Sequence, residues 1–254
     1  MSMTVIALAS GSSGNCTYVE AGGARLLFDA GISGVQAQRR LAARGRDIRD
    51  VDALIISHDH SDHVSCAGVY HRKFGLPVYM TRRTLRQAGA GSLGAIGQLH
   101  TFQAGGTLRF DGVSVQTIPT PHDAADGVAF VVSSGGRRFG LLTDLGHVFA
   151  CLGELISSLD AVLLESNHDV EMLRTGPYPD WLKRRVRGAG GHLSNEEAAG
   201  LLAPAVRLRW ACLGHLSEKN NNPEVALETH RRGAGRYLPI SVAGRYEPSE
   251  PLTL

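Results

Sequence analysis

The sequence predicts an α/β protein: an αββα sandwich, in which two mixed β-sheets pack together and helices cover both outer faces. Two observations support this fold class. Short strand-like segments fill the first half of the chain, and segments of helix and strand alternate from Gly146 onward. With 254 residues, of which 43% are hydrophobic and 20% charged, the chain has the composition of an ordinary globular protein. We expect one domain over residues 1–254.

The first half of the chain is predicted to consist mainly of strands. Apolar runs bounded by turn residues indicate strands at Thr4–Leu8, Cys16–Glu20, Arg25–Phe28 and Ala53–Ser57. A helix is expected at Asp62–Phe74, with Asp62 near its N-terminus, followed by a strand at Pro77–Met80. The pairs Asp111-Gly112 and Gly135-Gly136 are typical of hairpin turns. They accompany predicted strands at Thr107–Phe110, Val113–Ile118, Val128–Ser133 and Arg138–Thr143.

The second half alternates helices with apolar strands, as expected when helices cover a sheet. Helices are predicted at Val148–Ser158, Pro179–Arg187, Asn195–Leu202 and Pro223–Arg232. Strands are predicted at Ala161–Leu164 and Trp210–Leu213. No linker or internal repeat interrupts this pattern, so the two sheets are expected to belong to one sandwich.

Composition excludes several classes of protein. The early apolar run Val5–Ala9 is too short for a membrane span or a signal peptide, so no membrane association is expected. Four scattered cysteines without a CxxC pair argue against disulfides or a thiolate zinc site and favour a reducing cytoplasm: Cys16, Cys66, Cys151 and Cys212. The net charge of +2 gives no general attraction to nucleic acid, so any such affinity must come from local clusters.

Three histidines and two aspartates lie within the segment His58–His63, directly after an apolar strand-like run. Imidazole and carboxylate are the side chains that bind borderline divalent metals. His58 and His60 are two residues apart, so an extended backbone directs both toward one ion. Asp62 and His63 are adjacent and diverge, which suits a second ion nearby. A histidine-rich polar turn is the alternative, but the HxHxDH spacing behind a buried strand favours a metal site.

The remaining ligands of a two-metal centre must come from elsewhere in the chain, and suitable residues follow four other strands. Asp29 follows Leu26-Leu27-Phe28, His122 follows the strand at Val113–Ile118, Asp144 follows Leu141-Leu142-Thr143, and His215 follows Cys212-Leu213-Gly214. Taken singly, each is explained as well by a cap or turn residue. Taken together, they indicate one site at the strand ends, where Asp144 can bridge two ions.

These residues resemble the metallo-β-lactamase superfamily of hydrolases in order and in type. That resemblance implies the αββα fold. It also implies that metal one takes His58, His60 and His122, that metal two takes Asp62, His63 and His215, and that Asp144 bridges the two ions. Asp29 corresponds to a supporting carboxylate near the histidine loop and not to a direct ligand. The motif is specific for the superfamily but not for a substrate.

Further segments resemble the YycJ/WalJ group, whose bacterial members are described as 5′→3′ DNA exonucleases. They are Ala9–Cys16, Glu165–Asp169, Gly176–Pro179, Gly191–Glu196 and His215–Asn221. This resemblance implies a nucleic acid substrate, with DNA favoured over RNA. The Gly-His-Leu-Ser element is similar in placement to a Gly-His-Ser-Thr element of tRNase Z, whose histidine meets the scissile phosphate. His192 is therefore a candidate catalytic residue. The alternative is that it only precedes the N-cap Ser194.

The resemblance implies a metal-dependent phosphodiesterase mechanism. Two divalent ions ~3.5–4 Å apart generate a bridging hydroxide near neutral pH and clamp phosphoryl oxygens. Asp62 would orient the hydroxide, and His192 would protonate the leaving oxygen. The run Lys183–Arg187 either holds flanking phosphates or forms a solvated helix face. Zinc, manganese and iron all suit such ligands, so the sequence does not select among them, nor does it indicate the oligomeric state.

A thioester hydrolase of the glyoxalase II type is the competing function, because it uses the same fold and nearly the same ligands. The Gly-His-Leu-Ser element and the preceding basic run argue against it, as does the lack of an obvious C-terminal helical domain for a glutathione moiety. A binding protein that has lost its metals is a further alternative. All seven predicted ligand positions keep competent side chains, which argues against such decay.

Overall fold

Two seven-stranded mixed sheets form the centre of the computed structural model, which describes residues 2–233 and 238–254. The first sheet has the order β14-β1-β2-β3-β4-β5-β6. In that order the strands are Leu252–Thr253, Met3–Ala9, Cys16–Ala21, Ala24–Phe28, Ala53–Ile55, Val78–Thr81 and Leu99–Phe102. The second sheet has the order β13-β12-β11-β10-β9-β8-β7. Its strands are Ile240–Val242, Trp210–Gly214, Ala161–Glu165, Arg137–Leu142, Val128–Ser134, Val113–Pro119 and Thr107–Phe110.

Strand direction brings chemically important loops to one edge of the sandwich. In the first sheet β3, β4, β5 and β6 run parallel. In the second sheet β10, β11, β12 and β13 run parallel, and two antiparallel steps through β9 make β8 run the same way as β10. Because the carboxyl ends of parallel strands meet at one edge, the loops that follow β8, β10, β11 and β12 lie close together.

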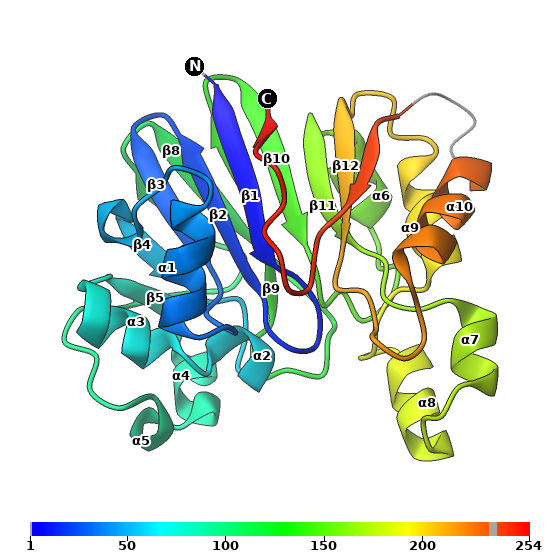
Figure 1. The fold of residues 1–254 in the computed structure, drawn as a ribbon, viewed down its shortest axis with the longest axis horizontal. Coiled ribbons are helices and arrows are strands. Elements are labelled where there is room, and N and C mark those ends of the chain that lie inside the picture. The colour runs from blue at the N-terminus through cyan, green and yellow to red at the C-terminus, as the bar shows by residue number, and fades with distance from the viewer. Residues whose placement is uncertain (1, 234–237) are drawn as a thin grey trace.

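Helices cover both outer faces, as Figure 1 shows. Those on the side of the first sheet are α1 (Gly34–Ala42), α2 (Ser61–Val64), α3 (Ala67–Phe74), α4 (Arg82–Ala88) and α5 (Ala90–Leu93), with a 3₁₀ turn at Ile48–Asp50. Those on the side of the second sheet are α6 (Leu152–Ser157), α7 (Val170–Thr175), α8 (Asp180–Arg187), α9 (Asn195–Leu202) and α10 (Pro223–Gly233). The short helix α2 and the longer α8 both lie at the lower end of the molecule in this view.

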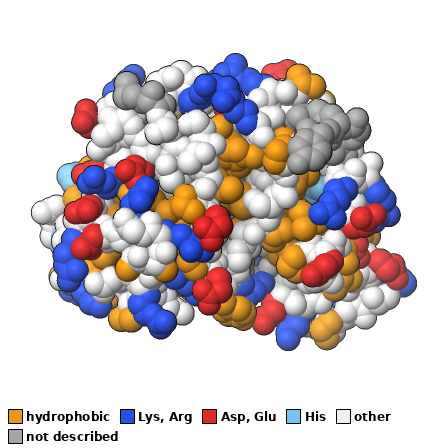
Figure 2. Space-filling model, turned by 45° about the horizontal axis from the view of Figure 1, so that its top comes forward, with side chains coloured by type: hydrophobic (Ala, Val, Ile, Leu, Met, Phe, Trp, Pro, Cys, Tyr) orange, Lys and Arg blue, Asp and Glu red, His pale blue; other side chains and the backbone are white. Residues whose placement is uncertain are grey.

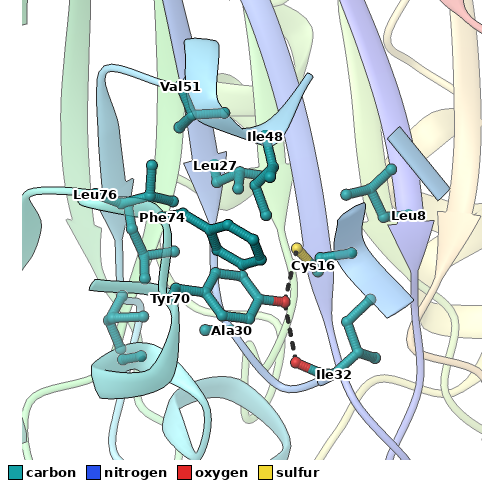
Figure 3. Close-up of a cluster of buried hydrophobic side chains, with 14 of the residues drawn as sticks. Leu8, Cys16, Leu27, Ala30, Ile32, Ile48, Val51, Tyr70, Phe74 and Leu76 are labelled. Atoms are coloured by element: carbon teal, nitrogen blue, oxygen red, sulfur yellow. Dashed lines mark hydrogen bonds between the residues drawn. The ribbon is translucent and has the colours of Figure 1, made fainter. Parts of the chain in front are cut away.

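Three buried apolar clusters hold these layers together. The central cluster fills the space between the sheets, where the rings of Phe28 and Phe130 lie 4.9 Å apart. A second cluster lies beneath α1 and α3, where the Tyr70 hydroxyl donates to the carbonyl oxygen of Ile32 at 2.9 Å (Figure 3). A third lies beneath α6, α9 and α10. Apolar burial on both faces of each sheet explains why the inner strands have continuous hydrophobic sequences.

The predicted αββα class is confirmed, but two predicted helices are wrong in extent. The segment Asp62–Phe74 forms two helices because the Asp62 carbonyl accepts the Asn15 N–H at 2.8 Å, while the Cys66 N–H donates to the Ala30 carbonyl at 2.9 Å. Neither bond continues the helical ladder. The helix predicted at Val148–Ser158 begins only at Leu152, because Cys151 adopts a left-handed conformation with φ +67°. Among the described residues, the elements that were not predicted are the 3₁₀ turn at Ile48–Asp50 and α1, α4, α5, α7, β6, β13 and β14.

Figure 2 shows the face that appears when the upper end of Figure 1 is turned toward the reader, with Lys and Arg interspersed with Asp and Glu. This mixture agrees with the net charge of +2. Within the described residues, no helix has both the length and the apolar character needed to cross a membrane.

His230 on α10 gives the fold a testable dependence on pH. The side chain is buried, and its Nε2 lies 3.1 Å from the Ser166 hydroxyl. Burial lowers the pKa of His230 from 6.5 to about 4, so the unfolded chain binds a proton more readily than the folded chain between these values. The contribution of neutral His230 to stability should be complete above pH 6.5 and should be lost as the pH falls toward 4.

We therefore expect acid to destabilise the wild type more than His230→Gln. Between pH 7.5 and 4.5, the wild type should lose about 2–3 kcal/mol more unfolding free energy than the variant, by proton linkage. Urea unfolding at the two pH values measures this difference, and acid effects on other groups cancel because both proteins share them. Equal losses in the two proteins would contradict the prediction.

Candidate metal centre

The seven predicted ligands come together at the edge of the sandwich where the parallel strands end. Three groups of side chains each have ligand atoms within 4.8 Å of one another: His58, His60 and His122; His58, His63 and Asp144; and Asp62, His63 and His215. Residues from four separate loops contribute to these groups. The groups share His58 and His63, so they form one continuous cluster.

His58, His60 and His122 form the first part of the cluster. The Nε2 atom of His58 is buried and has no hydrogen-bond partner. The Nδ1 atom of His60 lies 3.2 Å from Nε2 of His122. Two nitrogens bound to one zinc ion at ~2.0–2.1 Å in tetrahedral geometry lie roughly 3.4 Å apart, so this spacing fits a shared metal ion. His122 Nδ1 lies 3.0 Å from the Gly191 carbonyl, to which it can donate, and Nε2 then keeps its lone pair.

Asp62, His63 and His215 form the second part. The Asp62 Oδ2 atom lies 3.4 Å from His63 Nε2 and 3.5 Å from His215 Nε2. The expectation that Asp62 and His63 diverge is therefore wrong. They lie in the first turn of a helix, not in an extended strand, and their side chains converge. The Asn15 amide nitrogen lies 2.9 Å from His63 Nε2 and 3.2 Å from Asp62 Oδ2, so the loop before β2 closes this side of the cluster.

Asp144 lies between the two parts. Its Oδ1 atom is 3.6 Å from His122 Nε2, and its Oδ2 atom is 3.3 Å from His63 Nε2. The carboxylate is buried, and Oδ2 has no hydrogen-bond partner. An unpartnered buried carboxylate oxygen is costly unless a cation meets it. The position of Asp144 therefore fits a ligand shared between two ions.

A second layer of groups orients these ligands. Asp29 Oδ2 lies 2.8 Å from His63 Nδ1, and Asp29 also accepts the Ser57 N–H at 2.8 Å. Asp29 therefore contacts a candidate ligand and is not in the ligand groups itself, as the family resemblance implied. A bond of this kind fixes the ring so that the other nitrogen faces the cluster.

Glu165 at the end of β11 is a functional residue that the sequence interpretation missed. Its side chain is completely buried, and Oε1 lies 2.7 Å from His192 Nδ1 and 3.2 Å from His215 Nδ1. Oε2 accepts the backbone N–H groups of Leu145 and Leu193 at 3.1 and 3.3 Å. One carboxylate thus holds His192 and His215 together with the backbone of the His192 loop and of the loop after β10. The available signal was an acidic residue at the end of an otherwise apolar strand.

Burial and neighbouring charges set the protonation of the side chains in the cluster. Burial raises the pKa of Asp144, but the imidazoles of His215 and His63 outweigh this effect and hold the pKa well below its usual range. Burial lowers the pKa of His58 and His122, which keeps both imidazoles neutral. Burial also opposes charge on His215, yet Asp144 and other carboxylates raise its pKa to about 10. The surroundings of His215 therefore stabilise positive charge.

Unusual backbone geometry concentrates at this edge. Of the non-glycine residues in the described ranges, Asp29, Asp144, Cys151 and His215 have positive φ, between 55° and 67°. Three of these four follow strands and belong to the site. Left-handed backbone is unfavourable for such residues and persists only where the surroundings enforce it. Gly191 lets two backbone segments lie close together, because a Cβ atom there would collide with the Val186 carbonyl oxygen.

A cavity of about 350 Å³ opens onto the cluster. Its walls include Asp62, Asp144, His192 and His215, together with Ser12 of the glycine-rich loop and Tyr178 and Arg185 from the α8 region. The His192 side chain is 16% exposed, whereas those of His58 and His122 are buried. His192 is therefore a histidine that a molecule in this cavity can reach. It lies outside the three histidine–aspartate groups described above, but its ligand atom lies within 4.8 Å of those of Asp144, Glu165 and His215, with which it forms a fourth group.

Other residues singled out in the sequence lie outside the cluster. His168 is buried beside Ser194 and does not belong to any of the ligand groups. Arg82 and Arg83 line a separate cavity of about 600 Å³. Cys66 is a half-buried free cysteine that packs against the apolar cluster beneath α3.

The comparisons with known proteins identify the family of this fold. A family model described as the beta-lactamase superfamily domain matches residues 24–215, which are most of the chain. The chain therefore belongs to the metallo-β-lactamase superfamily, and the resemblance found in the HDHSDH motif is confirmed.

Within that superfamily the chain is similar to bacterial exodeoxyribonucleases. It is 38% identical over 224 residues to exodeoxyribonuclease WalJ of Streptococcus pneumoniae, covering 86% of this chain and 83% of the relative. It is also 38% identical over 223 residues to exodeoxyribonuclease YycJ of Bacillus anthracis, covering 86% and 84%. The metallo-beta-lactamase fold protein YhfI of Bacillus subtilis matches with a TM-score of 0.76 over 98% of this chain and 99% of its own, at 16% identity, which shows the shared fold.

Proposed function

We propose that this protein is a metal-dependent phosphodiesterase that cleaves nucleic acid, with DNA as the favoured substrate. The observation that carries the proposal is the position of His192. It lies in the cavity beside the seven ligands, and the buried Glu165 holds its Nδ1 atom. The similarity to proteins named exodeoxyribonuclease over most of their length supports the same function.

The residues present fit two divalent metal ions. His58 Nε2 and Asp144 Oδ2 are buried and have no hydrogen-bond partner in the protein, as expected of atoms that bind a metal ion. The first ion would be held by His58, His60 and His122, the second by Asp62, His63 and His215, with Asp144 shared between them. When bound, such ions lower the pKa of water and neutralise phosphoryl oxygens. Zinc, manganese and iron all suit this set of nitrogen and oxygen ligands.

Two residues of the chain have roles in proton movement. Asp62 is partly exposed to the cavity, where its carboxylate can accept a hydrogen bond from the attacking water and orient it. His192 donates Nδ1–H to Glu165, so Nε2 is the nitrogen available to the substrate. A proton on Nε2 can pass to the departing oxygen as the phosphorus–oxygen bond breaks. Glu165 positions this imidazole and stabilises its positive charge.

The basic residues of α8 support a polyanionic substrate, because Arg185 lines the same cavity as His192. All four cysteines are free, which supports our assignment to the reducing cytoplasm. We also propose that residues 1–254 act as one domain, because both sheets contribute ligands to the same cluster.

Comparing two substrates tests the reaction class. The metal-loaded protein should hydrolyse bis-p-nitrophenyl phosphate and single-stranded oligonucleotides, and chelation should abolish both activities. Raised salt should weaken oligonucleotide binding, because contacts to phosphates release counterions. Rapid hydrolysis of S-lactoylglutathione with no phosphodiesterase activity across zinc, manganese and iron would instead establish the thioester hydrolase.

Removing the shared carboxylate should empty the metal site. We expect wild-type protein to keep two ions per chain after loading and desalting, because most of the ligand side chains are buried and their ligand atoms already lie close together. Asp144→Ala should retain fewer than one, and His58→Ala should lose the ion of its own group. Elemental analysis measures the retention, and Glu196→Ala on the exposed side of α9 is the control for loss of an acidic residue. Full retention of both ions by Asp144→Ala would refute the ligand assignment.

His192→Ala separates general acid catalysis from metal binding. Metal content should stay unchanged, while kcat on oligonucleotides should fall by ~10²–10⁴-fold, the usual effect of losing one general acid. Bis-p-nitrophenyl phosphate should be much less affected, because p-nitrophenolate leaves without a proton. Glu165→Gln should show the same dependence on the leaving group.

Three other outcomes would overturn this role for His192. Loss of metal would make His192 a ligand. An equal loss on both substrates would make it a residue that positions the substrate. Unchanged kinetics would leave it as part of the turn that precedes α9, where Ser194 and Glu197 form the capping box.

A further inference from the structure

We propose that one side of α8, formed by Trp181, Arg184 and Arg185, binds unpaired nucleotides of a nucleic acid strand that leads into the metal cavity. The inference rests on the proposed function and deepens it, because it names single-stranded nucleic acid as the form that is bound. The occupant is a nucleotide strand whose base stacks on the Trp181 ring and whose phosphates meet the arginines.

Most of the Trp181 side chain is exposed to solvent and is not packed into the core. Its relative exposure is 61%, although α8 has buried and half-buried positions at Val186 and Leu182. The other tryptophan, Trp210, is half-buried, packs against Phe139 and donates Nε1–H to the Thr253 carbonyl oxygen at 2.9 Å. A large aromatic side chain left in solvent beside a functional cavity indicates a surface that meets a partner.

Helix geometry places Trp181 next to the cavity. Residues one turn apart lie on the same side of a helix, so Trp181 neighbours both Arg184 and Arg185. Arg185 and Leu182 line the metal cavity, and Tyr178 lines it just before the helix. Trp181 is therefore one helical turn from a residue that lines the cavity, and α8 itself stands at the end of the molecule that carries the ligand loops (Figure 1).

The charges on this side of α8 suit phosphates. Arg185 is held by Asp123, with Nε and Nη2 at 2.6 and 3.1 Å from its carboxylate oxygens, which ties α8 to the loop of His122. Arg184 is exposed and makes no side-chain hydrogen bond or ion pair with the residues that the structure describes. Its guanidinium is thus available to a ligand. On this side of α8, Arg184 therefore carries the uncompensated positive charge, because Asp123 pairs with Arg185.

An exposed indole beside arginines favours unpaired over paired nucleotides. The bases of a duplex already stack on one another, whereas an unpaired base offers its face to an aromatic side chain. Stacking of this kind tolerates every base, so it provides affinity without sequence preference. Phosphate contacts add a salt-dependent part to the binding free energy.

Tryptophan fluorescence tests the contact directly. The chain has two tryptophans, so Trp210→Phe leaves Trp181 as the only one and keeps an aromatic ring beside Phe139. We expect the metal-loaded Trp210→Phe protein to lose Trp181 fluorescence when a nuclease-resistant phosphorothioate oligothymidylate is added. The matching blunt duplex should quench much less. The same titration with oligouridylate shows whether RNA quenches Trp181 as strongly as DNA.

Affinity and its salt dependence separate stacking from charge. In the wild-type background, Trp181→Ala should raise the oligothymidylate Kd at least about fivefold, and Trp181→Phe should recover part of that loss. The slope of log Kd against log salt should not change in Trp181→Ala. In Arg184→Ala the slope should fall by about 0.7, the value for one lost phosphate contact on a single strand. Val206→Ala is the control, because Val206 is 79% exposed and lies before β12, at the opposite end of that strand from His215.

The outcomes distinguish this inference from the proposed function. If wild-type protein cleaves bis-p-nitrophenyl phosphate and oligonucleotides, while Trp181 is not quenched and Trp181→Ala binds as tightly as Val206→Ala, the α8 surface is wrong and the phosphodiesterase stands. If duplex and single strand quench equally, the preference for unpaired nucleotides is wrong. If wild-type protein cleaves neither substrate with any metal, the proposed function fails, whatever the fluorescence shows.

Discussion

The carboxylate of Asp144 is buried among the imidazoles of four histidines, and the rest of the site is arranged around its charge. A buried anion is expensive unless opposite charge or hydrogen bonds compensate it. Here one oxygen has no hydrogen-bond partner, and the backbone that carries it is left-handed. The unpartnered oxygen and the left-handed backbone both reduce stability, and both are consistent with a residue that serves to bind cations. The partners of the surrounding imidazoles, including Asp29 and Glu165, give those rings the orientation that the same cations require.

This arrangement depends on strand direction. His122, Asp144, Glu165 and His215 come from β8, β10, β11 and β12, which all end at the same edge although the antiparallel β9 lies between β8 and β10. The first sheet contributes the histidine loop after β4 to the same edge. The apolar cluster between the sheets fixes how close the two edges come, so core packing indirectly sets the distances among the ligands.

The sequence predicted what is local and missed what depends on distant contacts. The candidate ligands of the HxHxDH motif were predictable because four of them lie within six residues behind one strand. The break between α2 and α3 was not, because the Asp62 carbonyl is taken by Asn15, which is 47 residues away in the chain. Glu165 was missed as a site residue because its role needs the turns of His192 and His215 in place. Helix α1 is an exception, because it was missed although its signal is local: Ser33 and Gln36 form a capping box.

Glu165 also links metal binding to proton transfer. Its Oε1 atom meets both His192 and His215, and its Oε2 atom anchors the backbone after each of β10 and α8. The residues that follow it continue the connection, because the Asn167 amide donates to the His215 carbonyl and Asn221 donates to the carbonyls of Ser166 and Asn167. The proposed acid and one metal ligand therefore rest on a single buried polar network. Removing Glu165 would take a hydrogen-bond partner from both His192 and His215, so we expect metal affinity and leaving-group protonation to change together in a Glu165 variant.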